Sequence, residues 1–142
     1  MRGLPGFGSL VVVAIIAVGV AGCGSAAPTP AADGSIPVDL SEWNVTPAVA
    51  QASAGSITFT VSNKGSQTHE FVVVKTDTKA DALTVVDNKI DESTLTPVDE
   101  IEDIAVGANP TLTVDLAAGH YVLLCNIEAH YAQGMRADFD VK

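Results

Sequence analysis

The sequence predicts an all-β domain built as a sandwich of antiparallel strands, and three observations lead to this prediction. Short segments from residue 36 onward alternate apolar and polar residues, as ITFTVS does at 57–62. Turn-forming residues separate these segments, as NKGS does at 63–66. The chain has 142 residues, which is enough for one domain with a real apolar core and too few for two ordinary domains.

The expected strands follow one another along the chain with short turns between them. HEFVVVK, which begins at 69, is the most continuously apolar segment, and AAG at 117–119 turns the chain between two strands. The part from about 78 to 96 is less periodic, and we expect a short helix at 80–86. In chain order, we expect strands at 38–43, 57–62, 70–75, 111–116, 120–125 and 137–141.

The N-terminus predicts export and a lipid anchor. Residues 10–20 form an unbroken apolar run, LVVVAIIAVGV, which fits a signal peptide and is shorter than the roughly 20 residues of a membrane-spanning helix. VAGC then resembles the bacterial lipobox, at which Cys23 would be lipidated. An ordinary cleaved secretion signal or an uncleaved short anchor are the alternatives, and every version places the domain outside the cytoplasm. The expected division is a signal peptide at 1–22, the lipidated cysteine and a flexible tether at 23–35, and the domain at 36–142.

The chain is strongly acidic. It carries 17 acidic and 7 basic residues, and without residues 1–22, which contain Arg2, the balance is 17 against 6, or −11. This charge excludes nucleic acid as a partner and favours a basic protein. The acidic side chains between 87 and 103 form either a solvated surface or a docking patch for a basic redox partner. They are Asp87, Asp91, Glu92, Asp99, Glu100, Glu102 and Asp103.

Three potential metal ligands recur near the C-terminus. In CNIEAHYAQGM, Cys125, His130 and Met135 are each five residues from the next. They offer a thiolate, an imidazole and a thioether, and one more imidazole would complete the ligand set of mononuclear blue copper. If Cys23 carries lipid, Cys125 has no disulfide partner, and a lone thiol outside the cytoplasm is a liability unless it is buried or bound to metal.

Strand parity indicates which of the two remaining histidines could supply the second imidazole. His120 lies five residues before Cys125 on one strand, about 16 Å away at the rise of a strand, and points to the opposite face. His69 shares parity with Phe71 and Val73, so it points into the core at the end of its strand. Each such residue taken alone is more often a packing residue than a ligand. The combination predicts a metal site made by His69, Cys125, His130 and Met135.

THEFVV at 68–73 and AAGHYVLLCNIEAHYAQGMRADFDV at 117–141 resemble the cupredoxin family, which includes plastocyanin, azurin and auracyanin. The Cys-x4-His-x4-Met spacing is similar to that of auracyanin and sulfocyanin. The resemblance covers roughly 36–142 and implies a Greek-key β-sandwich with one type 1 copper near one end. It implies that His69 and His130 supply imidazoles, Cys125 the thiolate and Met135 the axial thioether. It also implies an electron carrier rather than an enzyme.

The chain departs from the family at two positions. Glu70 stands where many relatives have Asn or Ser, which brings the hydrogen bonding around the cysteine loop into question. Glu128 and Ala129 replace a common Pro-Gly, and the carboxylate of Glu128 is expected to favour the oxidised metal and lower the reduction potential.

Other residues in the loop narrow the class of copper protein. Asn126 stands where a multicopper oxidase needs a histidine, and Ala129 where a dinuclear copper site needs a second cysteine. Tyr131 either borders the electron-exit surface or packs against the loop. We expect Glu70, Asn126, Glu128 and Tyr131 to support the ligands or to form the partner surface.

The sequence therefore predicts a monomeric, lipid-anchored cupredoxin that carries single electrons between redox protein partners at the outer face of a bacterial membrane. Two alternatives remain open. One is copper capture or delivery without redox turnover. The other is an interaction module whose metal site is vestigial.

Overall fold

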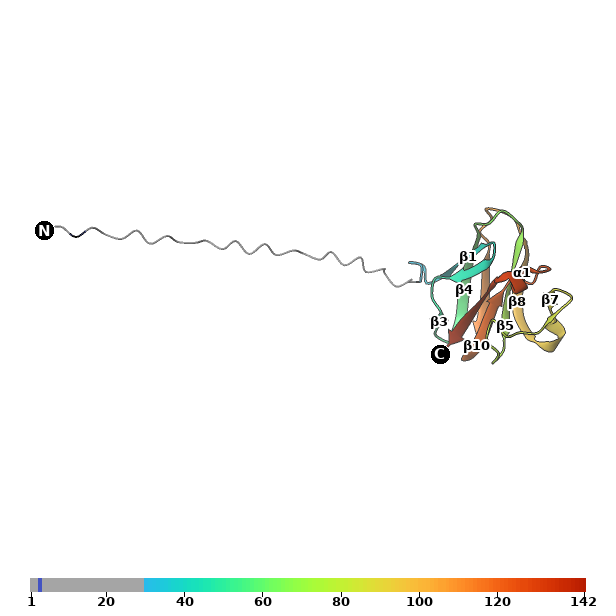
Figure 1. Ribbon diagram of the computed structural model, residues 1–142. Coiled ribbons are helices and arrows are strands. Elements are labelled where there is room, and N and C mark those ends of the chain that lie inside the picture. Colours follow the sequence, from blue (N-terminus) through green and yellow to red (C-terminus); the bar gives the residue numbers. More distant parts are fainter. Residues whose placement is uncertain (1–2, 4–29) are drawn as a thin grey trace.

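The computed structural model describes residue 3 and residues 30–142 (Figure 1). The predicted signal peptide, the lipidation site at Cys23 and the first part of the predicted tether lie outside these residues. Residues 31–35 form a hydrogen-bonded turn, in which Ala31 donates to the carbonyl of Ser35 at 2.8 Å. No helix within the described part of the chain is long and apolar enough to cross a membrane.

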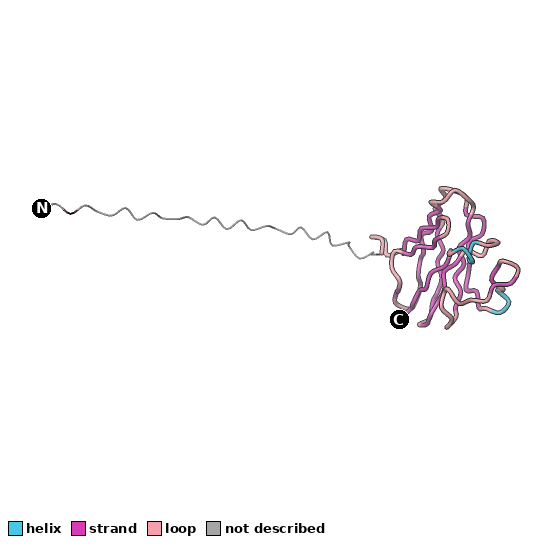
Figure 2. Tube along the Cα trace, viewed as in Figure 1, coloured by secondary structure: helices cyan, strands magenta, loops and turns pink. Residues whose placement is uncertain are grey.

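Two packed β-sheets form the domain (Figure 2). The first sheet contains, in spatial order, β2 (Asn44–Pro47), β1 (Ile36–Ser41), β4 (Gly55–Asn63) and β9 (Thr111–Leu116). The second contains β3 (Gln51–Ala52), β11 (Arg136–Val141), β10 (Gly119–Leu124), β5 (His69–Lys75) and β8 (Thr96–Ile104). A small hairpin of β6 (Val85–Val86) and β7 (Lys89–Ile90), the 3-10 turn η1 (Glu92–Thr94) and the one-turn helix α1 (His130–Gln133) complete the elements.

The predicted all-β sandwich is confirmed, but not all of its strand pairs are antiparallel. Most neighbouring strands are antiparallel, but β1 pairs with β4 in parallel, and so does β11 with β3. The chain leaves the first sheet after β2, joins the second sheet as β3 and then returns as β4. β4 therefore reaches β1 by a crossover rather than a hairpin, and a parallel pairing requires such a connection.

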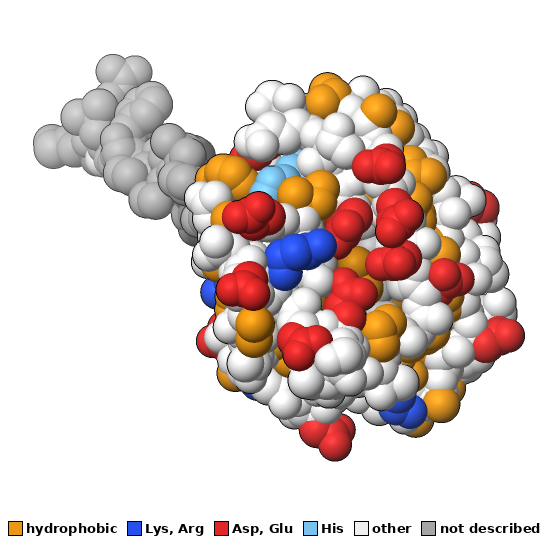
Figure 3. All heavy atoms as spheres, turned by 90° about the vertical axis from the view of Figure 1, so that its right-hand side faces the viewer, with side chains coloured by type: hydrophobic (Ala, Val, Ile, Leu, Met, Phe, Trp, Pro, Cys, Tyr) orange, Lys and Arg blue, Asp and Glu red, His pale blue; other side chains and the backbone are white. Residues whose placement is uncertain are grey.

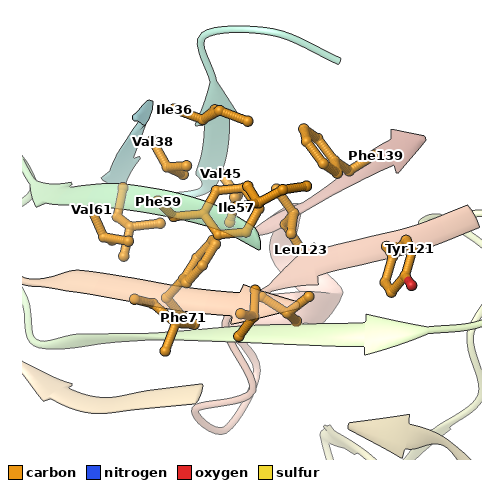
Figure 4. Packing of buried hydrophobic residues seen from close by; sticks show 14 of the residues in the cluster. Ile36, Val38, Val45, Ile57, Phe59, Val61, Phe71, Tyr121, Leu123 and Phe139 are labelled. Carbon is orange, nitrogen blue, oxygen red and sulfur yellow. The ribbon is translucent and has the colours of Figure 1, made fainter. Parts of the chain in front are cut away.

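The period-2 pattern of the strands builds the core between the sheets. β4 alternates buried and partly exposed residues, and its Ile57, Phe59 and Val61 point inward. The ring of Phe59 lies edge-on to the rings of Phe71 and Phe139, with centroids 5.4 Å and 5.5 Å away (Figure 4). These aromatic contacts join β4 of one sheet to β5 and β11 of the other, so they fix how the sheets face each other.

A second apolar cluster covers the outer face of β5 and β10. The segment after β5 brings Ala80, Leu83 and Ile90 over this face, and Tyr131 joins them from α1. The side chains of the sheet in this cluster are Val72, Val74, Val122 and Leu124. Both faces of β5 are therefore buried, which explains why its sequence is continuously apolar rather than alternating.

The prediction of a short helix at 80–86 is wrong. The segment contains a turn in which Ala82 donates to the carbonyl of Lys79, and it then enters β6. The hydroxyl of Tyr131 accepts from the N–H of Leu83 and donates to the carbonyl of Ala80. Because these backbone groups bond to a tertiary partner, they are not available for a helical ladder.

Candidate metal centre

Two adjacent strands bring the first two ligand candidates to the same end of the sandwich. His69 is the first residue of β5, and Cys125 directly follows β10. β10 pairs antiparallel with β5, with Leu124 opposite Val72. The start of one strand therefore lies beside the end of the other, as the parity argument predicted for an inward-pointing His69.

The loop after Cys125 folds back on itself and brings the other two candidates to the same place. The N–H of Cys125 donates to the carbonyl of Met135 at 3.1 Å, and the N–H of Met135 donates to the carbonyl of His130 at 3.1 Å. Gly134 has φ +129°, and a Cβ there would lie 2.8 Å from the carbonyl oxygen of Trp43. The loop thus closes only with a glycine at this position.

Three donor atoms converge inside this loop. Nδ1 of His69 lies 3.3 Å from Nδ1 of His130, which lies 3.4 Å from Sγ of Cys125. Donor atoms of all three residues lie within 4.8 Å of one another. Met135 is fully buried in the same core cluster as Cys125. The structure thus brings together His69, Cys125 and His130, with Met135 bonded to the loop beside them.

Burial sets the protonation of these groups. His69 and Cys125 are fully buried, and 6% of the surface of His130 is exposed. Burial lowers the pKa of His69, against an opposing effect of the Glu42 carboxylate, and burial and the nearby His69 lower the pKa of His130. Burial raises the pKa of the Cys125 thiol. Burial therefore favours the neutral form of both imidazoles, which is the form that binds a metal, whereas a metal would have to displace the proton of the thiol.

His120 lies outside the centre, as predicted. It belongs to β10 and shares the outer face of the sheet with Val122 and Leu124. Its Nδ1 is 2.8 Å from Oδ1 of Asp140, and its Nε2 is 3.0 Å from Oδ1 of Asp138. It therefore pairs with the carboxylates of β11.

Glu70 joins the two strands behind the sulfur. Its N–H donates to Sγ of Cys125 at 3.3 Å, and its Oε1 accepts from the N–H of Asn126 at 2.6 Å. Burial raises the pKa of Glu70, against the effect of the Asn126 hydrogen bond. The sequence left open whether a glutamate could support the cysteine loop at this position, and the carboxylate does accept a backbone hydrogen bond from it.

Asn126 ties the loop to the segment outside the sheet. Its Oδ1 accepts from the N–H of Ile90 at 2.6 Å, and its Nδ2 donates to the carbonyl of Ile90 at 3.0 Å and to Glu92 Oε1 at 2.6 Å. The N–H of Ala129 donates to the carbonyl of Asn88 at 2.8 Å. The segment 85–92 is therefore bonded to the loop at two places.

Tyr131 and Glu128 take different positions. Tyr131 is 3% exposed and packs in the outer apolar cluster, so of its two predicted roles the structure supports packing against the loop. Glu128 is exposed, and its Oε1 lies 3.5 Å from Nδ2 of Asn88. Trp43 packs its ring edge-on to that of His130, with centroids 5.3 Å apart.

Acidic side chains gather on the face that carries β8 and the 85–92 segment (Figure 3). Some of them have structural partners: Glu92 bonds to Asn126, and Asp91 caps η1 by accepting from the N–H of Ser93. The acidic residues of β8 are exposed: Asp99, Glu100, Glu102 and Asp103. Sequence analysis did not identify one further carboxylate beside the centre, that of Glu42, whose Oε1 lies 3.4 Å from Nε2 of His69.

The donor set fits one metal better than others. Two imidazoles, one thiolate and a nearby methionine are the ligands of type 1 copper, with the thioether as a weak axial ligand. Zinc is less suitable, because methionine is not one of its usual ligands. Nε2 of His69 is buried without a well-formed hydrogen bond among the described residues, while its Nδ1 faces the other donors. This orientation is the one that ligation through Nδ1 requires.

Comparisons with known proteins identify the family and the fold of the chain. The family model described as Sulfocyanin (SoxE) domain matches residues 48–142. No curated protein matches the chain. Among solved structures, the dithionite-reduced auracyanin of Roseiflexus castenholzii is similar, with 24% identity, a TM-score of 0.55, and coverage of 75% of this chain and 94% of that one.

Two further structures have the same fold. Auracyanin A of Chloroflexus aurantiacus, described as a "blue" copper protein, has 20% identity and a TM-score of 0.51, and the match covers 75% of this chain and 99% of that one. Reduced rusticyanin has 22% identity and a TM-score of 0.52, with coverage of 77% of this chain and 79% of that one. The fold is therefore that of the cupredoxins.

Proposed function

The chain belongs to the sulfocyanin domain family, and from this premise we propose that it is a type 1 copper protein that carries single electrons between redox partners. The observation that carries the proposal is the buried convergence of donor atoms from His69, Cys125 and His130 within 4.8 Å of one another. In this proposal His69 and His130 would hold the copper through Nδ1, Cys125 would bind as the thiolate, and Met135 would supply a weaker thioether ligand.

The protein's own part is to hold these donors still. Copper, when bound, would supply a centre that accepts and releases one electron. His69 and Cys125 are held by paired strands, and the loop hydrogen bonds hold His130 and Met135. Glu70 donates its N–H to the sulfur of Cys125, and its carboxylate accepts from the N–H of Asn126, the next residue in the loop. Such a frame favours a change of oxidation state with little movement of the ligands, which is what an electron carrier needs.

The proposed location and partners rest on the sequence. A lipid on Cys23 would hold a monomeric domain at the outer face of a bacterial membrane, with residues 24–35 as the tether. The excess of acidic over basic residues favours a basic partner, and the exposed acids of β8 are candidates for its docking surface. Association should then weaken as salt rises, because screening acts on exposed charges.

Copper capture or delivery is less well supported. A delivery protein needs a site from which the ion can leave, whereas here His69, Cys125 and Met135 are fully buried and His130 is nearly so. The rate at which a chelator removes copper would separate the two functions. Fast loss of copper would favour delivery.

The deciding experiment is a visible absorption spectrum of the soluble domain after addition of Cu(II) and then of a reductant. An intense thiolate-to-copper band that bleaches with the reductant and returns on reoxidation is the expected result. A protein that stays colourless with Cu(II) would contradict the proposed function.

A further inference from the structure

Glu42 lies in the turn between β1 and β2, on the opposite sheet from His69. Its Oε1 accepts hydrogen bonds from the N–H groups of Ser66 and Gln67, at 2.8 Å and 2.9 Å. These two bonds tie the side chain to the loop that leads into β5. A carboxylate that accepts two backbone N–H groups is stabilised in its charged form and held in one orientation.

The same oxygen also faces Nε2 of His69, whereas Nδ1 of that ring faces the other donor atoms. Oε1 of Glu42 lies 3.4 Å from Nε2 of His69, and Nε2 is buried without a well-formed hydrogen bond among residues 30–142. A buried N–H without a partner is unfavourable. A movement of about 0.5 Å would bring the pair to an ordinary hydrogen-bond distance. Glu42 is therefore placed to satisfy this nitrogen.

Gly65 makes room for this approach. A Cβ at position 65 would lie 2.6 Å and 2.9 Å from the two carboxylate oxygens of Glu42, and 2.9 Å from Nε2 of His69. Any side chain there would push between the carboxylate and the ring. Gly65 thus lies where Glu42 and His69 come together, and it leaves space for their contact because it has no side chain.

We propose that Glu42 is a positioning residue of the metal centre, whose carboxylate accepts the Nε2–H of His69 and so presents a bare Nδ1 to the metal. This inference rests on the proposed function. A hydrogen bond from a ligating imidazole to a carboxylate fixes the tautomer and raises the basicity of the ligand. A more basic ligand and a nearby negative charge favour the more positive metal, so Glu42 stabilises the oxidised state and lowers the reduction potential.

The main test is the reduction potential of Glu42→Gln. The amide oxygen can still accept from Ser66 and Gln67, so the loop should keep its shape and the protein should still turn blue with copper. Loss of a carboxylate behind a ligating histidine changes metal affinity by about tenfold or more. If the affinity falls about tenfold for oxidised copper and stays the same for reduced copper, the reduction potential rises by about 59 mV, the value for a one-electron couple.

Glu128→Gln is the matched control. It also removes one negative charge, here from the loop that carries the ligands. Glu128 is exposed, however, and contacts Asn88 rather than a ligand. We expect its shift to be less than half that of Glu42→Gln, because water screens an exposed charge. Equal shifts in the two variants would overturn the proposal, since a general charge effect would then suffice.

Gly65→Ala provides a second route that leaves all charges in place. Its methyl group should separate Glu42 from His69 and raise the potential in the same direction. The double variant Glu42→Gln/Gly65→Ala should show no more than the larger single shift, because one change removes the charge from the Glu42–His69 interaction and the other separates the same two groups. Full additivity would count against a shared contact.

A measurement without copper keeps the two proposals distinguishable. In the metal-free wild-type protein, 15N NMR should find the proton of neutral His69 on Nε2. Finding it on Nδ1 would overturn the role of Glu42, whatever the outcome with copper. If the wild-type protein did not bind copper, the proposed function would fail, while the tautomer would still decide whether Glu42 positions His69.

Discussion

Replacing Asn126 by alanine should destabilise the metal-free protein by about 3 kcal/mol. The side chain is 2% exposed and bonds to both the N–H and the carbonyl of Ile90. Because Ile90 is itself 3% exposed, the substitution leaves two buried backbone groups unpaired, at about 1–3 kcal/mol each. Entry of water into the space should recover part of this loss. The bond to Glu92 adds little, because that carboxylate is only partly buried and can bond to water.

Urea unfolding of the metal-free protein measures this loss. A change of about 3 kcal/mol should lower the urea midpoint with an unchanged slope, and it corresponds to a fall in Tm of about 12 °C or more for a domain of this size. Asn109→Ala is the control, since Asn109 is exposed and, among the residues that the structure describes, its side chain bonds only to the nearby carbonyl of Gly107. Its effect should stay within about 0.5 kcal/mol.

The result can refute the reasoning in a simple way. A loss below about 1 kcal/mol for Asn126→Ala would mean that water satisfies Ile90 and that the 85–92 segment is not held by this side chain. Asn126→Asp offers a check on the mechanism. It keeps the acceptor for the N–H of Ile90 but places a second carboxylate against Glu92, so it should be at least as destabilising.

Three other predictions concern the metal site and its histidines. Cys125→Ser should abolish any intense blue colour with Cu(II), because the thiolate is needed for it; a variant that stayed blue would contradict the ligand assignment. His120→Ala should leave the copper spectrum intact, since His120 pairs with carboxylates on the outer face of the sheet; a lost spectrum would refute the parity argument. Burial lowers the pKa of His69 and His130 from 6.5, so below pH 6.5 these two side chains bind more protons in the unfolded chain than in the folded one. The metal-free protein should therefore lose stability as the pH falls through this range, and His69→Gln/His130→Gln should lose less in the same urea measurements.

Much of the sheet could be predicted because burial on one face leaves an alternating pattern. β4 and β9 bury every second residue and were found from this pattern. β8 is as long as β4, but nearly all of its residues are exposed, so its sequence has no apolar period. The helix expected at 80–86 failed for a different reason, because Tyr131 takes the backbone hydrogen bonds of that segment.

The convergence of the donors could be predicted because spacing and strand parity are local properties. Cys125, His130 and Met135 share one loop, and the parity of His69 follows from its own strand. Their supports have no such signal. Glu42 is 27 positions before His69, and Asn126 is 36 positions after its partner Ile90. Only the packing of the two sheets and of the outer segment brings these groups together.

The supports reach the donors from separate parts of the fold, and this bears on what the centre can do. The Glu42–Trp43 turn comes from the opposite sheet and contacts both imidazoles, His69 through the carboxylate and His130 through the edge of the indole. Asn126 holds the other end of the loop from the outer face of the sheet. A donor held from several sides loses little conformational freedom when a metal binds and moves little when the charge of the metal changes. A site built for release would need at least one loosely held donor, and none of the three converging residues is both exposed and free of such contacts within the described part of the chain. The arrangement therefore favours electron transfer over copper delivery.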